Sequence, residues 1–226
     1  TRRCVRRVAV AVPAVTELDA LREDVAAGCR ELAGHGLALA GAGNVSVRTA
    51  EYVLITRAGL RFESAVSEDI TILTPAGEIV EGARPSSETG LHLGIYDRSA
   101  ARAVVHTHGR SSVAVGLVCD RMPLVHYNLF RLGGRIPTVP YHVFGSEELA
   151  NAVGDAVAEG FGTILMRNHG AVSSAPSIAA AVEHACLIEW LCDVYLAASS
   201  LGTPALLVDA DLDAVAAQSE RLAYGH

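Results

Sequence analysis

The sequence predicts a mixed α/β protein in which helices pack in layers on a β-sheet. Two observations lead to this prediction. Half of the 226 residues are hydrophobic, which is enough for a sizeable buried core. Short runs rich in β-branched residues alternate along the chain with longer segments of helical periodicity. The sequence contains no internal repeat, low-complexity tract or linker, so we expect an irregular segment at 1–15 followed by a single domain at 16–226.

The helices are predicted from apolar spacing and from end signals. Thr16, with Asp19 three residues later, resembles a capping pair, and apolar residues then recur at helical spacing as far as Gly34. A second set of segments is also interpreted as helical, and the last of these is apolar on most faces and therefore expected to be buried. These segments are residues 86–97, 111–118, 146–159 and 177–199.

The strands are predicted as short apolar runs bounded by glycine, proline or charged residues. They cover residues 52–56, 69–74, 103–108, 136–143 and 163–168. The segment from Gly41 to Ser46 is interpreted differently, as a flexible turn rich in hydrogen-bond donors.

Charge and composition argue against several classes of function. The formal net charge of -7 argues against a nucleic-acid partner, and no apolar stretch approaches the ~18 residues of a membrane span. Five scattered cysteines without a Cys-x-x-Cys pair indicate reduced thiols in the cytoplasm. All eighteen basic residues are arginine, so a lysine Schiff base is impossible. A carbanion beside a carbonyl would therefore need a metal ion or a bound cofactor.

Three histidines form the sharpest candidate site. His106 and His108 are two residues apart on a predicted strand, so both imidazoles can face one metal ion. His169 follows another predicted strand at a glycine turn, a common place for ligand-binding residues. Three neutral imidazoles leave the open coordination position that catalytic zinc needs. The ordinary alternatives are a histidine-lined surface for the pair and a turn histidine at 169.

A carboxylate and two hydroxyl groups mark the start of a predicted helix. Glu88 could simply complement the helix dipole there, and His92, one turn later, offers an intrahelical pair as an alternative. Ser86 and Ser87 precede Glu88 at the helix N-terminus, where backbone N–H groups suit a phosphate. The Asn44 amide, in the glycine-rich segment, could also donate to an anion.

Together these features resemble the class II aldolase and adducin family from about residue 18 to the C-terminus. The resemblance rests on five motifs in a consistent order, Gly43-Asn44-Val45-Ser46, Pro85-Ser86-Ser87-Glu88, His106-Thr107-His108, Val139-Pro140-Tyr141 before Phe144-Gly145, and Asn168-His169-Gly170. It implies a three-layer αβα sandwich with a mixed, mostly antiparallel central sheet. It also implies a homotetramer with active sites between subunits.

For the metal, the resemblance implies zinc on His106, His108 and His169, with manganese or cobalt as alternatives. Glu88 would be a resting ligand that moves off to act as general base. Tyr127 matches a tyrosine that one branch of the family lends to the neighbouring subunit as a proton donor. Tyr224 matches a C-terminal tyrosine that closes the site. For both tyrosines the alternative is ordinary packing.

For the substrate, Asn44, Gly59, Ser86 and Ser87 match positions that hold a phosphate in the family. The family usually has a hydroxyl residue where this chain has Ala58, so one phosphate contact is lost. The neighbouring Arg57 could replace it with a bidentate contact, or it could point to solvent.

The resemblance therefore implies a class II, zinc-dependent aldehyde-lyase. It would cleave a ketose 1-phosphate of the fuculose-phosphate or 5-deoxypentulose-phosphate kind, reversibly, to dihydroxyacetone phosphate and an aldehyde. Alternatives on the same scaffold are decarboxylation of a 3-oxo-tetronate phosphate, 4-epimerisation of a pentulose phosphate, dehydration of methylthioribulose phosphate, and an adducin-like interaction module without activity.

Overall fold

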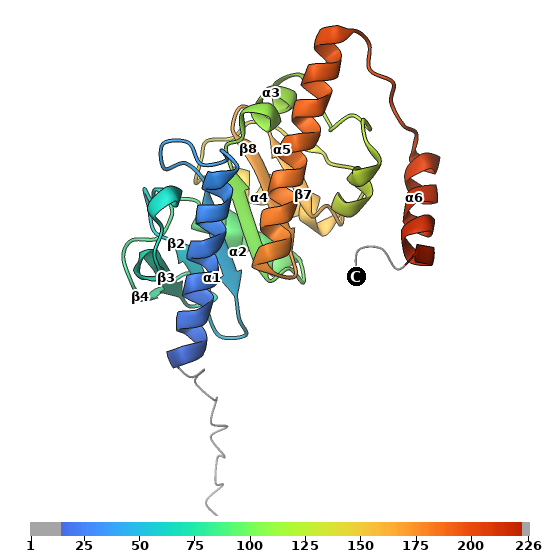
Figure 1. Ribbon diagram of the computed structural model, residues 1–226. Helices are drawn as coiled ribbons and strands as arrows, with labels where there is room; N and C mark the ends of the chain where they lie inside the picture. Colours follow the sequence, from blue (N-terminus) through green and yellow to red (C-terminus); the bar gives the residue numbers. More distant parts are fainter. Residues whose placement is uncertain (1–14, 223–226) are drawn as a thin grey trace, which may run out of the picture.

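An eight-stranded sheet lies between two layers of helices in the structure, a computed structural model that describes residues 15–222 (Figure 1). The strand order is β4-β3-β2-β1-β5-β8-β7-β6. Neighbouring strands are antiparallel except β6 and β7, which are parallel. The predicted α/β class and mostly antiparallel sheet are therefore confirmed. The strands are β1 Asn44–Arg48, β2 Val53–Thr56, β3 Ile70–Leu73, β4 Ile79–Glu81, β5 Ala103–Thr107, β6 Thr138–Val139, β7 Thr163–Met166 and β8 Gly170–Ala175.

Six α-helices are present in residues 15–222, together with three short 3-10 segments. The α-helices are α1 Val15–Gly34, α2 Thr89–Arg98, α3 Arg110–Val118, α4 Glu147–Ala158, α5 Ile178–Leu201 and α6 Asp209–Leu222. The 3-10 segments are η1 Phe62–Ser64, η2 Ser67–Asp69 and η3 Tyr127–Leu132. None of the helices within the described residues combines the length and the apolar character needed to cross a membrane.

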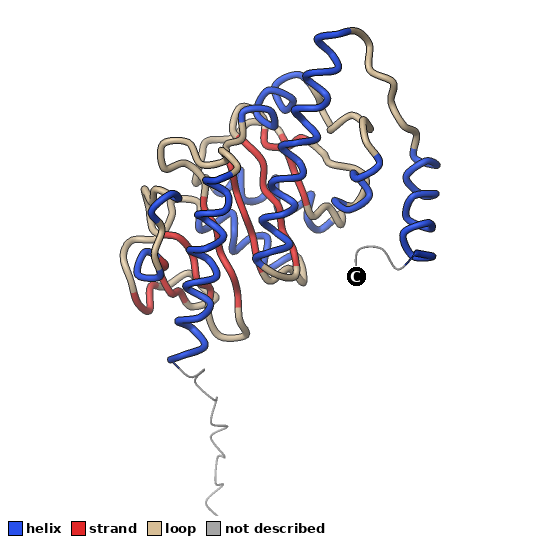
Figure 2. The backbone as a smooth tube through the Cα atoms, in the orientation of Figure 1, coloured by secondary structure: helices blue, strands red, loops and turns tan. Residues whose placement is uncertain are grey.

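The two faces of the sheet are covered by different helices. Helices α1 and α5 cross the face nearer the viewer in Figures 1 and 2, and α2 packs against α4 behind the sheet. Alternate residues of a strand point to opposite faces, so Leu54 packs in the cluster with α1 whereas Ile55 packs in the cluster with α2 and α4. Val105 and Val104 divide in the same way on β5.

Several predicted boundaries need correction. The strand predicted over 136–143 shrinks to two residues, because Pro137 and Pro140 flank β6 and lack the N–H that a ladder needs. The helix predicted from Ser86 begins at Thr89, and the strand predicted to Asn168 ends at Met166. Residues 1–14 of the segment expected to be irregular lie outside the described residues, and residue 15 belongs to α1.

Among the strands and α-helices of the described residues, β1, β4, β8 and α6 were not predicted, and neither were the three 3-10 segments. The turn interpretation of Gly41 to Ser46 is wrong from Asn44 onward, because β1 begins there. Its polar side chains alternate with valines and point into a buried polar site, so the usual pattern of a half-exposed strand is absent. Strand β8 consists of small residues and contains two serines, which gives it little β signal.

Candidate active site

The antiparallel register brings the start of β1, the end of β5 and the turn between β7 and β8 to the same end of the sheet. Asn44, the first residue of β1, pairs with His106 near the end of β5. On the other side of β5, His106 pairs with Val172 of β8, and the β7–β8 turn carries His169. Side chains from positions far apart in the sequence therefore meet at this end of the central strands, beside the start of α2.

One ligand atom from each of Glu88, His106, His108 and His169 lies within 4.8 Å of the others, which makes this a candidate metal centre. The Nε2 atoms of His106 and His108 are 2.8 Å apart. The Glu88 carboxylate joins two ligands, with Oε2 3.1 Å from His106 Nε2 and Oε1 3.3 Å from His169 Nε2. The side chains of Glu88 and His169 are each 7% exposed, and that of His106 is fully buried.

The chemistry of this donor set fits a divalent cation. His106 donates a hydrogen bond from Nδ1 to the carbonyl oxygen of Ala171, at 2.9 Å, so Nε2 is the ring atom directed at the cluster and available to bind a cation there. Glu88 Oε1 is buried and makes no hydrogen bond, although it lies at ion-pair distance from His169. An anionic oxygen buried in this way is costly unless a cation or a donor faces it.

The protonation states also suit a metal. Burial raises the pKa of the Glu88 carboxyl, but the hydrogen bond and charge of His106, the charge of His169 and the Asn44 amide outweigh it and hold that pKa well below its usual value. Burial and then the neighbouring imidazoles lower the pKa of His108 to about 3, and the same causes lower that of His169. Neutral imidazoles and an ionised carboxylate are the forms that bind metals.

Local backbone geometry explains two of the sequence motifs. Gly43 has φ of +95°, and a Cβ at this position would lie 2.8 Å from the carbonyl oxygen of His106. Only glycine therefore allows this segment to approach the metal-ligand strand. Asn168 has φ of 57°, a left-handed conformation that asparagine tolerates, and it turns the chain so that His169 faces the cluster.

A cavity of about 370 Å³ opens beside the candidate metal centre. Its lining combines glycines, serine hydroxyls and one arginine with three of the four candidate metal ligands and with aromatic side chains. The lining residues are Gly41, Ala42, Gly43, Asn44, Arg57, Ala58, Gly59, Ser86, Ser87, Glu88, His108, Tyr141, His142, Phe144, Asn168 and His169.

The Ser86 hydroxyl is arranged to donate to an anion in this cavity. Its oxygen accepts hydrogen bonds from Asn44 Nδ2, at 3.0 Å, and from the Glu88 backbone N–H, at 3.2 Å. Both lone pairs of the oxygen are then engaged, so its own hydrogen is free to donate.

Arg57 lines the cavity but is not a free cation. Its Nε donates to Asp69 Oδ1 at 2.6 Å, and its Nη1 donates to the Ala58 carbonyl oxygen at 3.3 Å. The Asp69 carboxylate partly neutralises the guanidinium, which weakens its attraction for a phosphate.

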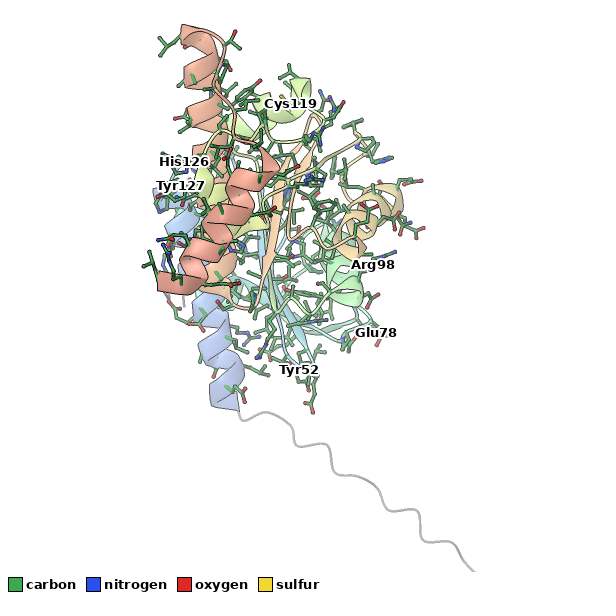
Figure 3. All side chains as sticks on the ribbon, turned by 90° about the vertical axis from the view of Figure 1, so that its right-hand side faces the viewer. Tyr52, Glu78, Arg98, Cys119, His126 and Tyr127 are labelled. Atoms are coloured by element: carbon green, nitrogen blue, oxygen red, sulfur yellow. The ribbon has the colours of Figure 1, made fainter. Side chains whose placement is uncertain are left out.

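Not every candidate residue reaches the cavity of its own chain. Tyr127 is 51% exposed at the start of η3, and its ring stacks on His126 with 4.4 Å between centroids (Figure 3). It does not line the cavity, so its predicted role in a neighbouring subunit stays a prediction. Tyr224 lies outside the described residues.

Sequence reasoning gave no role to three cavity residues and considered the wrong partner for one buried histidine. Tyr141, His142 and Phe144 follow the short strand β6 and line the cavity, although two of them were noticed within a family motif. The His92 ring does not hydrogen-bond to the Glu88 carboxylate as the intrahelical alternative required; only the backbone N–H of His92 donates to the Glu88 carbonyl oxygen, at 3.4 Å. Its ring instead contacts Asn44 and a serine on β1.

A second carboxylate holds the segment that follows His108. Glu189 on α5 accepts hydrogen bonds from the backbone N–H groups of Ser111, at 2.6 Å, and Ser112, at 2.9 Å, in the first turn of α3. A Cβ at position 109 would overlap the Glu189 carboxylate, so the residue after His108 must be glycine for this contact to form. The contact fixes the chain immediately after a metal ligand.

Comparisons with known proteins agree with this fold and identify the family. Residues 23–196 match the family model "Class II Aldolase and Adducin N-terminal domain", and the chain belongs to this family. The family expected from the sequence motifs is therefore confirmed.

Two relatives and one solved structure are similar over most of the chain. A 5-deoxy-D-ribulose 1-phosphate aldolase of Bacillus thuringiensis serovar kurstaki is 32% identical over 88% of this chain and 95% of its own length. An L-fuculose phosphate aldolase of Escherichia coli strain K12 is 34% identical over 78% of this chain and 82% of its own. The structure of an L-fuculose 1-phosphate aldolase superposes with a TM-score of 0.83 at 26% identity, covering 89% of this chain and 96% of that one.

The cluster predicts one strongly bound divalent cation per chain. Because His106 contacts both His108 and Glu88, we expect His106→Ala to weaken zinc binding at least about 100-fold, as direct ligands matter more than their supporting groups. His35→Ala is the matched control, since His35 is exposed at the end of α1. Titration against a chromophoric chelator measures both variants. Equal zinc affinity in the two variants would exclude this centre.

The buried neutral histidines predict that the metal-free protein loses stability in acid. Burial lowers the pKa values of His92 and His108 to about 3, from 6.5. Between these limits the unfolded chain binds more protons than the folded chain, so the free energy of unfolding falls as pH decreases from about 6.5. We expect the urea midpoint of chelator-treated protein to be lower at about pH 5 than at about pH 7.5. The same midpoint at both pH values would contradict this prediction.

Proposed function

We propose that the protein is a zinc-dependent aldehyde-lyase that cleaves a ketose 1-phosphate, reversibly, to dihydroxyacetone phosphate and an aldehyde. The observation that carries the proposal is one cavity lined both by three of the four candidate metal ligands, Glu88, His108 and His169, and by glycines and serine hydroxyls that suit an anion. A ketose 1-phosphate needs both, because its phosphate and its carbonyl oxygen are only a few bonds apart.

His106, His108, His169 and Glu88 would hold the metal, with zinc the preferred ion of a three-histidine set and manganese or cobalt as substitutes. When bound, such an ion supplies Lewis acidity that polarises a carbonyl oxygen and stabilises negative charge. No lysine is present in the sequence to take this role through an iminium.

The chain's own residues bind the phosphate and move the proton. The Ser86 hydroxyl donates to the phosphate, with Ser87, Gly59 and the Asn44 amide beside it. Glu88 carries the proton to and from the carbon that becomes part of dihydroxyacetone phosphate, since its Oε1 has no hydrogen-bond donor to restrain it. Arg57 contributes a smaller attraction for the phosphate, because Asp69 shares its charge.

Relatives support the choice of substrate class. The two named above act on 5-deoxy-D-ribulose 1-phosphate and L-fuculose phosphate, and a third, from Rhodospirillum rubrum, is named for 5-methylthioribulose 1-phosphate and 5-deoxyribulose 1-phosphate. All the substrates in these names are phosphorylated ketoses. We therefore place the substrate of this chain among ketose 1-phosphates of five or six carbons.

The assembly we propose is a cytoplasmic homotetramer whose active sites lie between subunits. In it, Tyr127 of a neighbouring copy serves as proton donor to the aldehyde oxygen, and Tyr224 closes the site. The half-exposed Tyr127 stacks on His126, whose ring also lies 5.0 Å from that of the exposed Trp190, and this supports the assembly because such aromatic groups gather at protein interfaces.

A coupled assay for dihydroxyacetone phosphate tests the reaction. The substrates are fuculose, rhamnulose, ribulose and 5-deoxyribulose 1-phosphates, each with zinc-loaded and chelator-treated protein. We expect release from at least one ketose phosphate, its loss on chelation and its recovery when zinc is returned. No release from zinc-loaded protein on any substrate would reject the aldolase.

The role of Glu88 predicts a specific defect. We expect Glu88→Gln to retain zinc but to lower kcat by at least about 100-fold, the range for lost general acid–base catalysis. Glu78→Gln is the matched control, because Glu78 is exposed on the far side of the sheet from α6 (Figure 3). Zinc analysis of both variants accompanies the kinetics. Near-normal turnover of Glu88→Gln would remove Glu88 from the mechanism.

A further inference from the structure

A continuous chain of buried side chains runs from α2 to the cavity. The hydroxyl of Tyr96 lies 2.6 Å from Ser46 Oγ, which lies 2.6 Å from His92 Nδ1. On the other side of the ring, His92 Nε2 lies 2.5 Å from Asn44 Oδ1. The Asn44 amide nitrogen then reaches Glu88 Oε2 at 3.1 Å and Ser86 Oγ at 3.0 Å.

The direction of every bond in this chain follows from its charged end. An ionised carboxylate only accepts hydrogen bonds, so the Asn44 atom facing Glu88 is its amide nitrogen, and its carbonyl oxygen faces His92. The nitrogen of His92 that meets this oxygen must carry a proton. In a neutral ring the other nitrogen is then an acceptor, and Ser46 must donate to it.

Burial makes this arrangement hard to replace. Asn44 is 2% exposed, Tyr96 is 5% exposed, and Ser46 and His92 are fully buried, so water cannot substitute for a lost partner. Burial lowers the pKa of His92, and the charge of His106 lowers it further, to about 3, which keeps the ring neutral. A neutral ring carries one N–H proton, and only the Nε2–H tautomer both donates to Asn44 and accepts from Ser46.

We propose that His92 is a positioning residue, which uses its Nε2–H to hold the Asn44 amide with its nitrogen toward Glu88 and Ser86. The Asn44 amide in turn orients the Glu88 carboxylate and leaves the Ser86 hydrogen free for an anion. A rotated Asn44 amide would present its oxygen to the carboxylate and to the phosphate, and both contacts would become repulsive. The catalytic consequence rests on the proposed function, whereas the tautomer and the effect on anion binding do not.

Two substitutions at position 92 separate positioning from packing. The amide nitrogen of glutamine occupies a place like that of Nε2, so His92→Gln can still donate to Asn44. The shorter asparagine reaches only the place of Nδ1, so His92→Asn keeps a polar group near Ser46 but leaves Asn44 Oδ1 without its donor. Both variants place an amide in the same buried site, so loss of the imidazole ring is common to them. Asparagine is one methylene shorter, and zinc retention in both variants checks that this packing difference leaves the site folded.

The measurements are made on full-length, zinc-loaded protein. In the wild type, long-range proton–nitrogen NMR of histidine-labelled protein should show the His92 ring as the Nε2–H tautomer. The His92 signal is identified by its absence from the His92→Gln spectrum. We expect His92→Gln to bind inorganic phosphate and to turn over substrate within about 5-fold of the wild type, and His92→Asn to lose about 10-fold or more in both, each variant retaining one zinc per chain.

An Nδ1–H tautomer in the wild type would overturn the proposal, and so would equal phosphate affinity in the two variants. These two results do not depend on catalysis. If the wild type releases no dihydroxyacetone phosphate from any ketose phosphate, the proposed function fails, while the tautomer and phosphate affinities still decide the role of His92.

Discussion

The buried carboxylate of Glu88 is the group on which the architecture of the site depends. An ionised group at this depth must be compensated, and three elements contribute to that compensation. His106 from β5, His169 from the β7–β8 turn and Asn44 from β1 all place nitrogen atoms against its two oxygens. The loop before α2 is thereby attached to the ends of the central strands β1 and β5 and to the β7–β8 turn.

That attachment works only because the strands are in register. Asn44 is directly opposite His106 across the β1–β5 pair, and Ser46 is opposite Val104, so both polar β1 side chains point to the face covered by α2. A shift of one residue would turn Asn44 and Ser46 toward α1 and its apolar cluster. The buried polar side chains of β1 therefore help to specify the β1–β5 register, together with the backbone hydrogen bonds between the two strands.

The sequence sufficed for the fold class and for residues whose chemistry is expressed locally. His106 and His108 could be paired because they are two apart on one strand, and Glu88 was notable because two serines precede it. The short polar strand β1 could not be recognised, since the side chains of Asn44 and Ser46 are buried in contacts with His92 of α2 that no local pattern encodes. The role of His92 was hidden for the same reason. Its partners lie 46 and 48 residues away in the sequence.

The two-residue strand β6 has an implication for how such enzymes diversify. Tyr141, His142 and Phe144 follow it and line the cavity, but they lie outside the hydrogen-bonded ladder and contribute no metal ligand. The segment can therefore accept new side chains without disturbing the sheet register or the histidine cluster. The aromatic part of the cavity lining and the candidate metal ligands therefore lie in separate stretches of the chain, so substitutions at positions 141 to 144 can reshape the cavity while the ligand set stays unchanged.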